Sequence, residues 1–282
     1  MPAHAAYAPR MLISRQQLIH LDQDAQDDVV HTLAQRAEEG DAAAQQVLRD
    51  IVIHYGDVSQ ATYVRTLNRA YAFKEETLTE PLLAALSDTD YGCQAWSAMA
   101  CGQLGVHAAT PLLVPLLGDA DHHVRESVCT ALGELRAREA TGALAALLLD
   151  DPLEHVRAAA ARALSAIGTD DAVEALFAAF HARRYPVVGY LVGALARCGP
   201  RTHHRLVEAT AHDDAGIRYW AARTLGATGD DQFEPLLSRV VADDHATTPT
   251  GARVSTGAKK GLRTMHRIQA QALDQVPVPE DD

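Results

Sequence analysis

Apolar side chains recur along most of the chain at three- and four-residue spacing, the spacing of one face of an α-helix. Five segments of thirteen residues superpose without gaps: CQAWSAMACGQLG from Cys93, VRESVCTALGELR from Val124, VRAAAARALSAIG from Val156, VVGYLVGALARCG from Val187 and IRYWAARTLGATG from Ile217. Their starts lie 31, 32, 31 and 30 residues apart. An interval that varies so little predicts an internal structural repeat.

A second apolar run lies between successive segments and predicts a second helix in each repeat. These runs begin at Pro81, Pro111, Ala143, Ala172 and Phe233. The helices formed by the aligned segments are expected to end at glycines, which favour the left-handed C-cap conformation. These glycines are Gly105, Gly168, Gly199 and Gly229. Each unit is therefore predicted to be a helical hairpin. One such hairpin cannot bury its own apolar face, so neighbouring hairpins must stack.

The pattern D-x-x-x-x-V-R-x-x-A-x-x-A-L-x-x-(L/I)-G is clearest in residues 151–168 and resembles the short HEAT-like repeat of phycobilisome bilin lyases. The resemblance covers roughly residues 57–243. It implies an all-α fold, a right-handed α-solenoid of HEAT-like helical hairpins without a sheet. It also implies a ladder of Asp and Arg side chains along the turns, formed by Asp88, Asp119, Asp151, Arg125, Arg157 and Arg218. We expect the ladder to be interrupted at Gln94, Ala182 and Val188.

Three parts of the chain are predicted. Residues 1–56 form an N-terminal helical cap, in which Ser14 and Gln17 match a capping box. Residues 57–243 form the repeat array. Residues 244–282 hold a capping helix over about 255–273 and then a disordered tail that ends in PVPEDD.

Charge and cysteine content narrow the choice of partners and compartment. The formal net charge is −12 and the isoelectric point is near 5.5. Such a field repels phosphate backbones, so we expect no nucleic-acid partner. The four cysteines show no CxxC pair, which favours small buried side chains in a reducing compartment. Neither a signal peptide nor a membrane-spanning run is found in the sequence, so we expect a cytoplasmic protein without a membrane partner.

No motif for catalysis is present. The sequence contains no P-loop, no Gly-x-Ser-x-Gly elbow and no zinc-binding pattern. His122, His123 and His155 are interpreted as solvated turn residues rather than metal ligands. The HEAT-like deoxyhypusine hydroxylases use His-Glu dipeptides to hold iron, and no such dipeptide occurs here. We therefore expect no catalytic residue, no metal and no cofactor.

The five aligned segments act as an internal alignment, and their variable columns indicate a surface. The start of each segment and the positions seven and eight residues later agree in type and are expected to be core. The positions two, three, six and ten residues after the start differ, and by resemblance they lie on the concave surface of the solenoid. Aromatic residues and arginine are enriched at binding hot spots. The predicted partner-binding residues are Trp96, Arg162, Tyr190, Arg197, Tyr219, Trp220 and Arg223. The alternative for each tryptophan is packing against the next repeat.

The sequence thus predicts a non-enzymatic interaction module, an adaptor, scaffold or inhibitor that binds a protein or peptide in its concave groove. A toxin-immunity protein is one particular form of this hypothesis. The repeat type alone suggests a second hypothesis, a bilin lyase-like protein that handles tetrapyrroles. A HEAT-like DNA glycosylase is a third, and the acidic balance argues against it.

Overall fold

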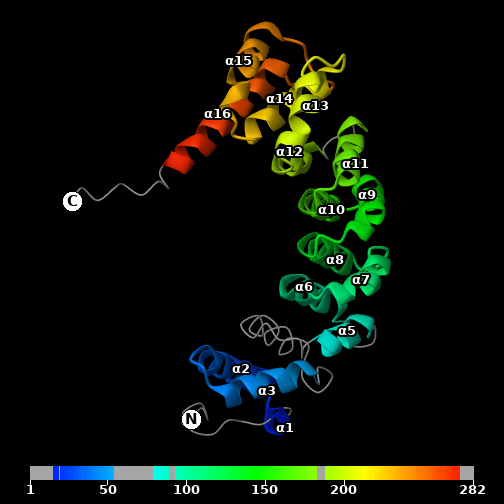
Figure 1. Cartoon of the computed structure of the whole chain (residues 1–282), viewed down its shortest axis with the longest axis vertical. Helices are drawn as coiled ribbons and strands as arrows, with labels where there is room; N and C mark the ends of the chain where they lie inside the picture. The colour runs from blue at the N-terminus through cyan, green and yellow to red at the C-terminus, as the bar shows by residue number, and fades with distance from the viewer. Residues whose placement is uncertain (1–14, 19, 54–78, 89–92, 183–187, 274–282) are drawn as a thin grey trace, which may run out of the picture. The chain divides into compact units, whose positions relative to one another are not determined.

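A computed structural model describes residues 15–18, 20–53, 79–88, 93–182 and 188–273 (Figure 1). Over these ranges the chain is helical, and its extended pairing is limited to one bridge between Thr247 and Arg253. Contacts divide the chain into two compact units, residues 1–135 and 136–282. Stacked helical hairpins build both units, which confirms the predicted all-α solenoid.

The first unit begins with a helical hairpin and continues with repeats. Its helices are α1 (Arg15–Leu18), α2 (Gln23–Glu38), α3 (Ala42–Ile53), α5 (Thr79–Ser87), α6 (Gln94–Leu104), α7 (Thr110–Leu116) and α8 (His122–Glu134), with the 3-10 turn η4 (His107–Ala109) before α7. Helix α2 packs against α3, and α3 packs against α5. Helices α5 and α7 form one layer, and α6 and α8 form the other.

The second unit continues the same two-layer arrangement. Its elements are η5 (Arg138–Ala140), α9 (Thr141–Asp150), α10 (Glu154–Ile167), α11 (Asp170–His181), α12 (Val188–Arg197), α13 (Pro200–Ala209), α14 (Ala215–Ala227), η6 (Asp231–Phe233), α15 (Glu234–Asp243) and α16 (Val254–Leu273). Helices α10, α12, α14 and α16 pack in that order and form one layer. Helix α16 thus continues the layer, as expected for the final helix predicted over about 255–273.

The predicted core columns are buried. Val156, Ala163 and Leu164 of α10 are buried, as are Ala194 and Leu195 of α12. The same columns of the other aligned helices are buried wherever the structure describes them. Their agreement in type therefore reflects a shared core requirement for close packing.

Three of the four cysteines are buried thiols, as predicted: Cys93, Cys101 and Cys129. Burial raises the pKa of the Cys101 thiol to about 12. Cys198 is only half-buried. The first three therefore behave as small apolar side chains in the core.

The turns are held by caps of the expected kind. Asp121 and Asp214 accept hydrogen bonds from the first backbone N–H groups of α8 and α14, at 2.8 Å to His123 N and Gly216 N. The glycines predicted at helix ends all have positive φ: Gly105, Gly168, Gly199 and Gly229. These residues supply the conformations that let one helix stop and the next begin.

Two of the ladder arginines donate hydrogen bonds to backbone carbonyl oxygens. Arg125 Nη1 donates to the carbonyl oxygens of Asp119 and Ala120, at 2.8 and 3.1 Å. Arg157 Nη1 donates to the carbonyl oxygen of Asp151 at 2.6 Å. The expected pairing of Arg157 with a neighbouring carboxylate is therefore corrected. These guanidinium groups satisfy carbonyls that the turn leaves without helical partners.

One ladder arginine also binds a carboxylate. Arg218 Nε lies 2.7 Å from a carboxylate oxygen of Asp244, and its Nη1 donates to the carbonyl oxygens of His212 and Asp213. Asp244, which was not among the predicted ladder residues, supplies the carboxylate at this turn. The pKa of Asp244 is lowered, because the Arg218 hydrogen bonds and further favourable contacts outweigh a burial that by itself raises it.

Several predictions concern residues outside the described ranges. They are the capping box at Ser14, the first repeat at Asp57 and the tail over 277–282. The predicted boundaries at residues 56 and 243 stay predictions, since the contacts divide the chain within the repeat array instead.

Candidate functional site

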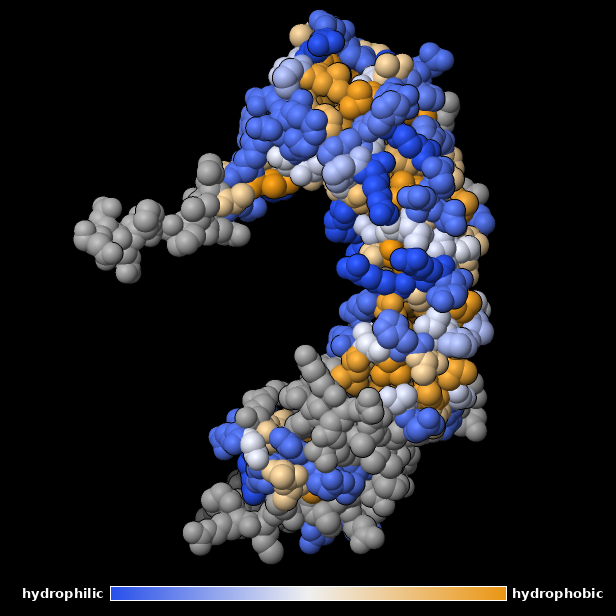
Figure 2. All heavy atoms as spheres, in the orientation of Figure 1, coloured by the Kyte–Doolittle hydropathy of each residue, from blue (hydrophilic) through white to orange (hydrophobic). Residues whose placement is uncertain are grey.

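The outward columns of the second unit lie on helices α10, α12 and α14. Arg162 and Arg197, six and ten residues after their segment starts, are exposed. Arg223, in the same column as Arg162, is partly exposed. Figure 2 shows strongly hydrophilic residues over α10 and α12. We call Arg162, Tyr190, Arg197, Trp220 and Arg223 the arginine–aromatic face of the second unit.

Trp220 and Arg223 form a pair on α14. The guanidinium carbon of Arg223 lies 5.2 Å from the centroid of the Trp220 ring, within the range of a cation–π contact. Trp220 is only partly buried. A rigid indole with a guanidinium held over it offers an apolar surface and a positive charge together.

Tyr219 does not belong to this face, which corrects its prediction as a binding residue. Its side chain is only 6% exposed, and its ring meets the edge of Trp220 at a centroid distance of 5.1 Å. A Cβ at Gly257 of α16 would lie 2.6 Å from the Tyr219 ring. Helix α16 therefore covers Tyr219 and makes it a core residue.

Tyr190 is intermediate between core and surface. The ring is half-buried, and its hydroxyl oxygen is buried without a well-formed hydrogen bond among the described residues. Burial raises the pKa of this hydroxyl, while the neighbouring Arg157 guanidinium acts against the rise. The exposed part of Tyr190 therefore does not include its hydroxyl oxygen.

Trp96 lies on α6 in the first unit and is described with that unit. It is 38% exposed, as is Leu112 of α7. Figure 2 shows hydrophobic residues in the region of α5 and α6. Trp96 therefore matches the expectation of an outward tryptophan, and the structure does not join it to the arginine–aromatic face.

A hollow of about 580 Å³ lies at the ends of α10 and α12, within the second unit. Three turns line it: Arg136 and Arg138 before α9, residues 165–170 between α10 and α11, and Arg197, Cys198 and Arg201 between α12 and α13. We call Arg136, Arg138, Arg197 and Arg201 the arginine pocket. Arg197 was predicted from the sequence and the other three were not, because Arg136 stands in the column that the other repeats fill with glycine, and Arg138 and Arg201 lie outside the aligned segments.

Contacts within the arginine pocket hold the turns together. Ser165 at the end of α10 donates a hydrogen bond of 2.9 Å to the carbonyl oxygen of Ala194 in α12. Arg201 donates to the carbonyl oxygen of Gly168, and its Nη1 lies 3.9 Å from Asp170. Burial raises the pKa of Cys198, and the hydrogen bond to Ser165 and the nearby arginines act against this rise. Hydrogen bonds to backbone carbonyl oxygens thus join α10 to α12 and Gly168 to Arg201.

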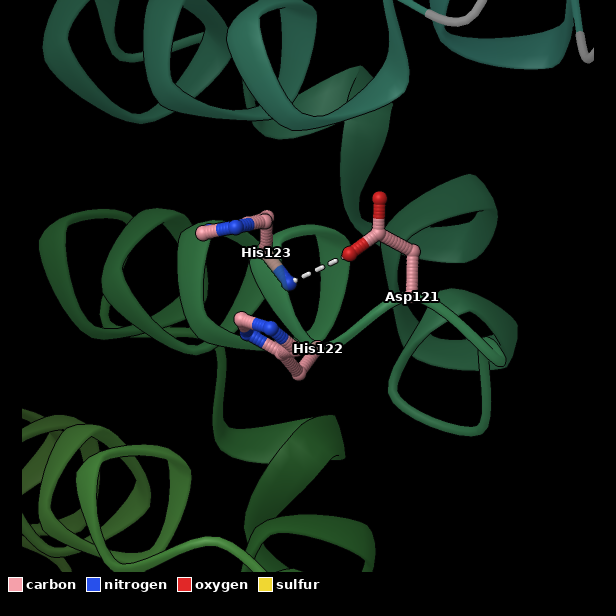
Figure 3. A group of neighbouring side chains, drawn as sticks. All are labelled: Asp121, His122 and His123. Atoms are coloured by element: carbon pink, nitrogen blue, oxygen red, sulfur yellow. Dashed lines mark hydrogen bonds between the residues drawn. The ribbon is translucent and has the colours of Figure 1, made fainter.

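Figure 3 shows Asp121, His122 and His123 at the start of α8, in the first unit. Their possible ligand atoms lie within 4.8 Å of one another, and the two imidazole centroids are 4.0 Å apart. The Asp121 carboxylate accepts the hydrogen bond from the backbone N–H of His123, so one of its oxygens caps the helix. This use explains the aspartate without an ion, and the absence of a metal site stays a prediction.

No helix of the described ranges has the length and apolar character that a membrane crossing requires. This finding agrees with the absence of an apolar run of that length in the sequence.

Comparisons with known proteins identify the repeats. The family model described as HEAT repeats matches residues 79–154 and 110–196, and the model described as PBS lyase HEAT-like repeat matches 217–243. No curated protein matches the chain.

Solved structures show a similar fold at low sequence identity. An engineered protein is 20% identical, with 89% of this chain and 77% of that chain covered and a TM-score of 0.51. The complex of CpcE and CpcF of phycocyanin lyase from Nostoc sp. PCC7120 is 22% identical, covers 82% of this chain and 94% of that chain, and has a TM-score of 0.49. Human deoxyhypusine hydroxylase in complex with glycerol is 18% identical, with 90% of this chain and 94% of that chain covered and a TM-score of 0.37.

The family matches cover most of the aligned helices and of the runs between them, with residues 197–216 unmatched, and the helical hairpins of both units have the architecture that these repeats require. The chain belongs to the HEAT-repeat proteins, with repeats of the short PBS lyase HEAT-like type.

Proposed function

We propose that the protein is a non-enzymatic binding module whose second unit holds a partner protein or peptide on the arginine–aromatic face. The observation that carries this proposal is the pair of Trp220 and Arg223 on α14. A partly exposed indole is costly to leave in water, and arginine and tryptophan are among the residue types most enriched at binding hot spots.

The neighbouring columns support the same conclusion. Arg162 and Arg197 are exposed and are not needed to bury the core columns of α10 and α12. The whole chain carries a net charge of −12, so a local concentration of guanidinium groups stands against its average field. Such a surface favours a partner that presents an apolar anchor beside carboxylates.

The test uses the tagged full chain and three variants. Trp220→Ala and Arg223→Glu change the face, and Arg239→Glu makes the same charge change at an exposed position of α15. Proteins captured from a lysate of the source cells are quantified by mass spectrometry, and the dissociation constant of the enriched partner is then measured. Truncation of a hot-spot tryptophan weakens binding by about 2–4 kcal/mol, roughly thirtyfold to a thousandfold.

The proposal requires one protein to be lost with both face variants and retained with Arg239→Glu. Circular dichroism must show that the face variants keep their helical signal. If Trp220→Ala lowers the melting temperature and leaves the affinity of the folded fraction unchanged, Trp220 is a packing residue. Equal capture by all four proteins moves the binding site away from this face.

The match of residues 217–243 to the PBS lyase HEAT-like repeat supports a second candidate, a protein that handles tetrapyrroles. Purified protein mixed with a bilin and passed through a desalting column distinguishes the two. Retained absorbance of the pigment supports the second candidate, and a colourless protein argues against it.

A further inference from the structure

The arginine pocket places four guanidinium groups around one hollow in an acidic protein. Arg136 and Arg138 precede α9, Arg197 is the last residue of α12, and Arg201 lies in the first turn of α13. The only acidic residue in the lining is Asp170. Arg201 is engaged with Gly168 and Asp170, whereas Arg136, Arg138 and Arg197 form no ion pair with any residue that the structure describes.

The backbone of Arg136 is the second observation. It is the only non-glycine residue of the described ranges with positive φ, at 50°. Its position corresponds to the last residue of each aligned segment, where the other four repeats have Gly105, Gly168, Gly199 and Gly229, with φ between 64° and 74°. A side chain is strained in this conformation, and such strain persists mainly where a function requires it.

The surroundings keep the hollow open. The hydrogen bond between Ser165 and the carbonyl oxygen of Ala194 ties the end of α10, which supplies Ser165, Ala166 and Ile167 to the lining, to α12. Arg201 ties the α12–α13 turn to the carbonyl oxygen of Gly168. Like charges repel one another in a pocket of this kind, and a bound anion relieves that repulsion.

We propose that the arginine pocket binds a phosphate monoester dianion. A guanidinium fork donates two parallel hydrogen bonds, and a phosphate monoester offers three oxygens and about two negative charges to several forks at once. A single carboxylate is matched by one arginine. The hollow, at about 580 Å³, also has room for the group that carries the phosphate. The carrier is a phosphorylated side chain of another protein or a small phosphorylated metabolite.

The proposal does not depend on the partner-binding face, although both use Arg197. It concerns the turns at the ends of α10 and α12, and a phosphorylated probe occupies it with no protein partner present. Failure of partner capture therefore leaves it standing, and its own failure leaves the face untouched.

The experiment measures binding to the full chain by isothermal titration calorimetry in a phosphate-free buffer of low salt. The probes are phosphoserine, ribose 5-phosphate and inorganic phosphate, with serine, ribose and aspartate as their controls. The variants are Arg136→Gly and Arg138→Ala, and Arg239→Ala on α15 is the matched charge control. Arg136→Gly places the residue type of the other repeats at a position with positive φ, so it removes the guanidinium without harming the turn.

We expect a phosphorylated probe to bind at least tenfold more tightly than aspartate and than its unphosphorylated control. Arg136→Gly and Arg138→Ala should each weaken this binding about tenfold to a hundredfold, the effect of losing a charge-assisted hydrogen bond. Arg136→Gly should melt at or above the temperature of the unchanged protein, and Arg239→Ala should bind as the unchanged protein does. Tighter binding of phosphoserine or of ribose 5-phosphate assigns the carrier.

Three results overturn the proposal. The first is no binding of any phosphorylated probe at 10 mM, about the weakest affinity that the method measures. The second is equal affinity for aspartate. The third is an affinity that stays the same in Arg136→Gly and Arg138→Ala, which shows only a general attraction of anions to exposed arginines.

Discussion

Helices α14 and α16 approach each other too closely for ordinary side chains. A Cβ at Gly226 would lie 2.3 Å from the carbonyl carbon and oxygen of Gly261, and a Cβ at Gly261 would lie 2.6 Å from the carbonyl oxygen of Ala222. Non-bonded heavy atoms prefer about 3.5 Å or more. The substitution Gly226→Ala therefore requires α16 to move outward by about 1 Å.

The expected loss of stability follows from two opposing effects. Overpacking of a filled interface costs about 1–3 kcal/mol. Replacing glycine by alanine within a helix stabilises the helix by about 1 kcal/mol. The obstacle here is the backbone of a second helix and not a flexible side chain, so the cost lies at the upper end of its range. Ala258 and Met265 of α16 are fully buried and lose contacts when the helix moves. We expect Gly226→Ala to lower the free energy of unfolding by about 2 kcal/mol.

Urea denaturation is followed by the fluorescence of Trp220 on α14, in proteins that also carry Trp96→Phe so that the signal comes from this interface. Gly142→Ala is the control, because a Cβ at Gly142 in the first turn of α9 meets nothing within 4 Å. The control should be neutral or stabilising by up to about 1 kcal/mol. The double variant Gly226→Ala with Gly261→Ala should cost less than the sum of the single variants, because one displacement of α16 accommodates both methyl groups. A Gly226→Ala protein as stable as the control refutes the close approach.

Two further predictions concern Arg218 on α14 and His181 at the end of α11. Arg218→Ala should lower the free energy of unfolding by about 1–3 kcal/mol in thermal denaturation, because Asp244 and two turn carbonyls lose their donor; an unchanged melting temperature contradicts this. Burial first, then the charges of His212 and Arg205, lower the pKa of His181 from 6.5. The unfolded chain therefore takes up the proton first as the pH falls below 6.5, and stability should fall from there through the lowered folded pKa. His181→Gln should reduce this pH dependence of the unfolding free energy, and an equal slope in both proteins contradicts the assignment.

Periodicity predicted the fold because every repeat meets the same packing requirement. Val156, Ala163 and Leu164 stand in columns of similar residues, since each helix of this layer must fit the next in the same way. The glycine at each helix end was predicted for an equally local reason, its tolerance of positive φ. Neither prediction requires knowledge of contacts between distant parts of the sequence.

The wrong predictions concern residues whose environment depends on tertiary contacts. Tyr219 is in a variable column of its segment, and its burial depends on Gly257 of α16, whose sequence lies outside the aligned segments. The aspartate–arginine pattern predicted paired side chains, yet Arg157 donates to a backbone carbonyl, an acceptor that every residue carries and no sequence distinguishes.

Arg136 shows how an alignment of repeats can indicate a site through an exception to a backbone requirement, and not only through variable surface columns. Four repeats have glycine at this position, where the backbone has positive φ. Glycine has no side chain that could serve a function there. Arginine at that position adds strain of about 1–2 kcal/mol and adds no burial, because its side chain is exposed. Arg136 therefore lowers the stability of the fold relative to glycine, and its contribution to the protein is its positive charge. The other arginines of the pocket reach the same hollow from later turns without such strain, and only Arg136 departs from a rule that the backbone itself sets. In a repeat protein, an exception to a backbone rule is a sharper indication of function than variation in an exposed column, where the fold permits almost any side chain.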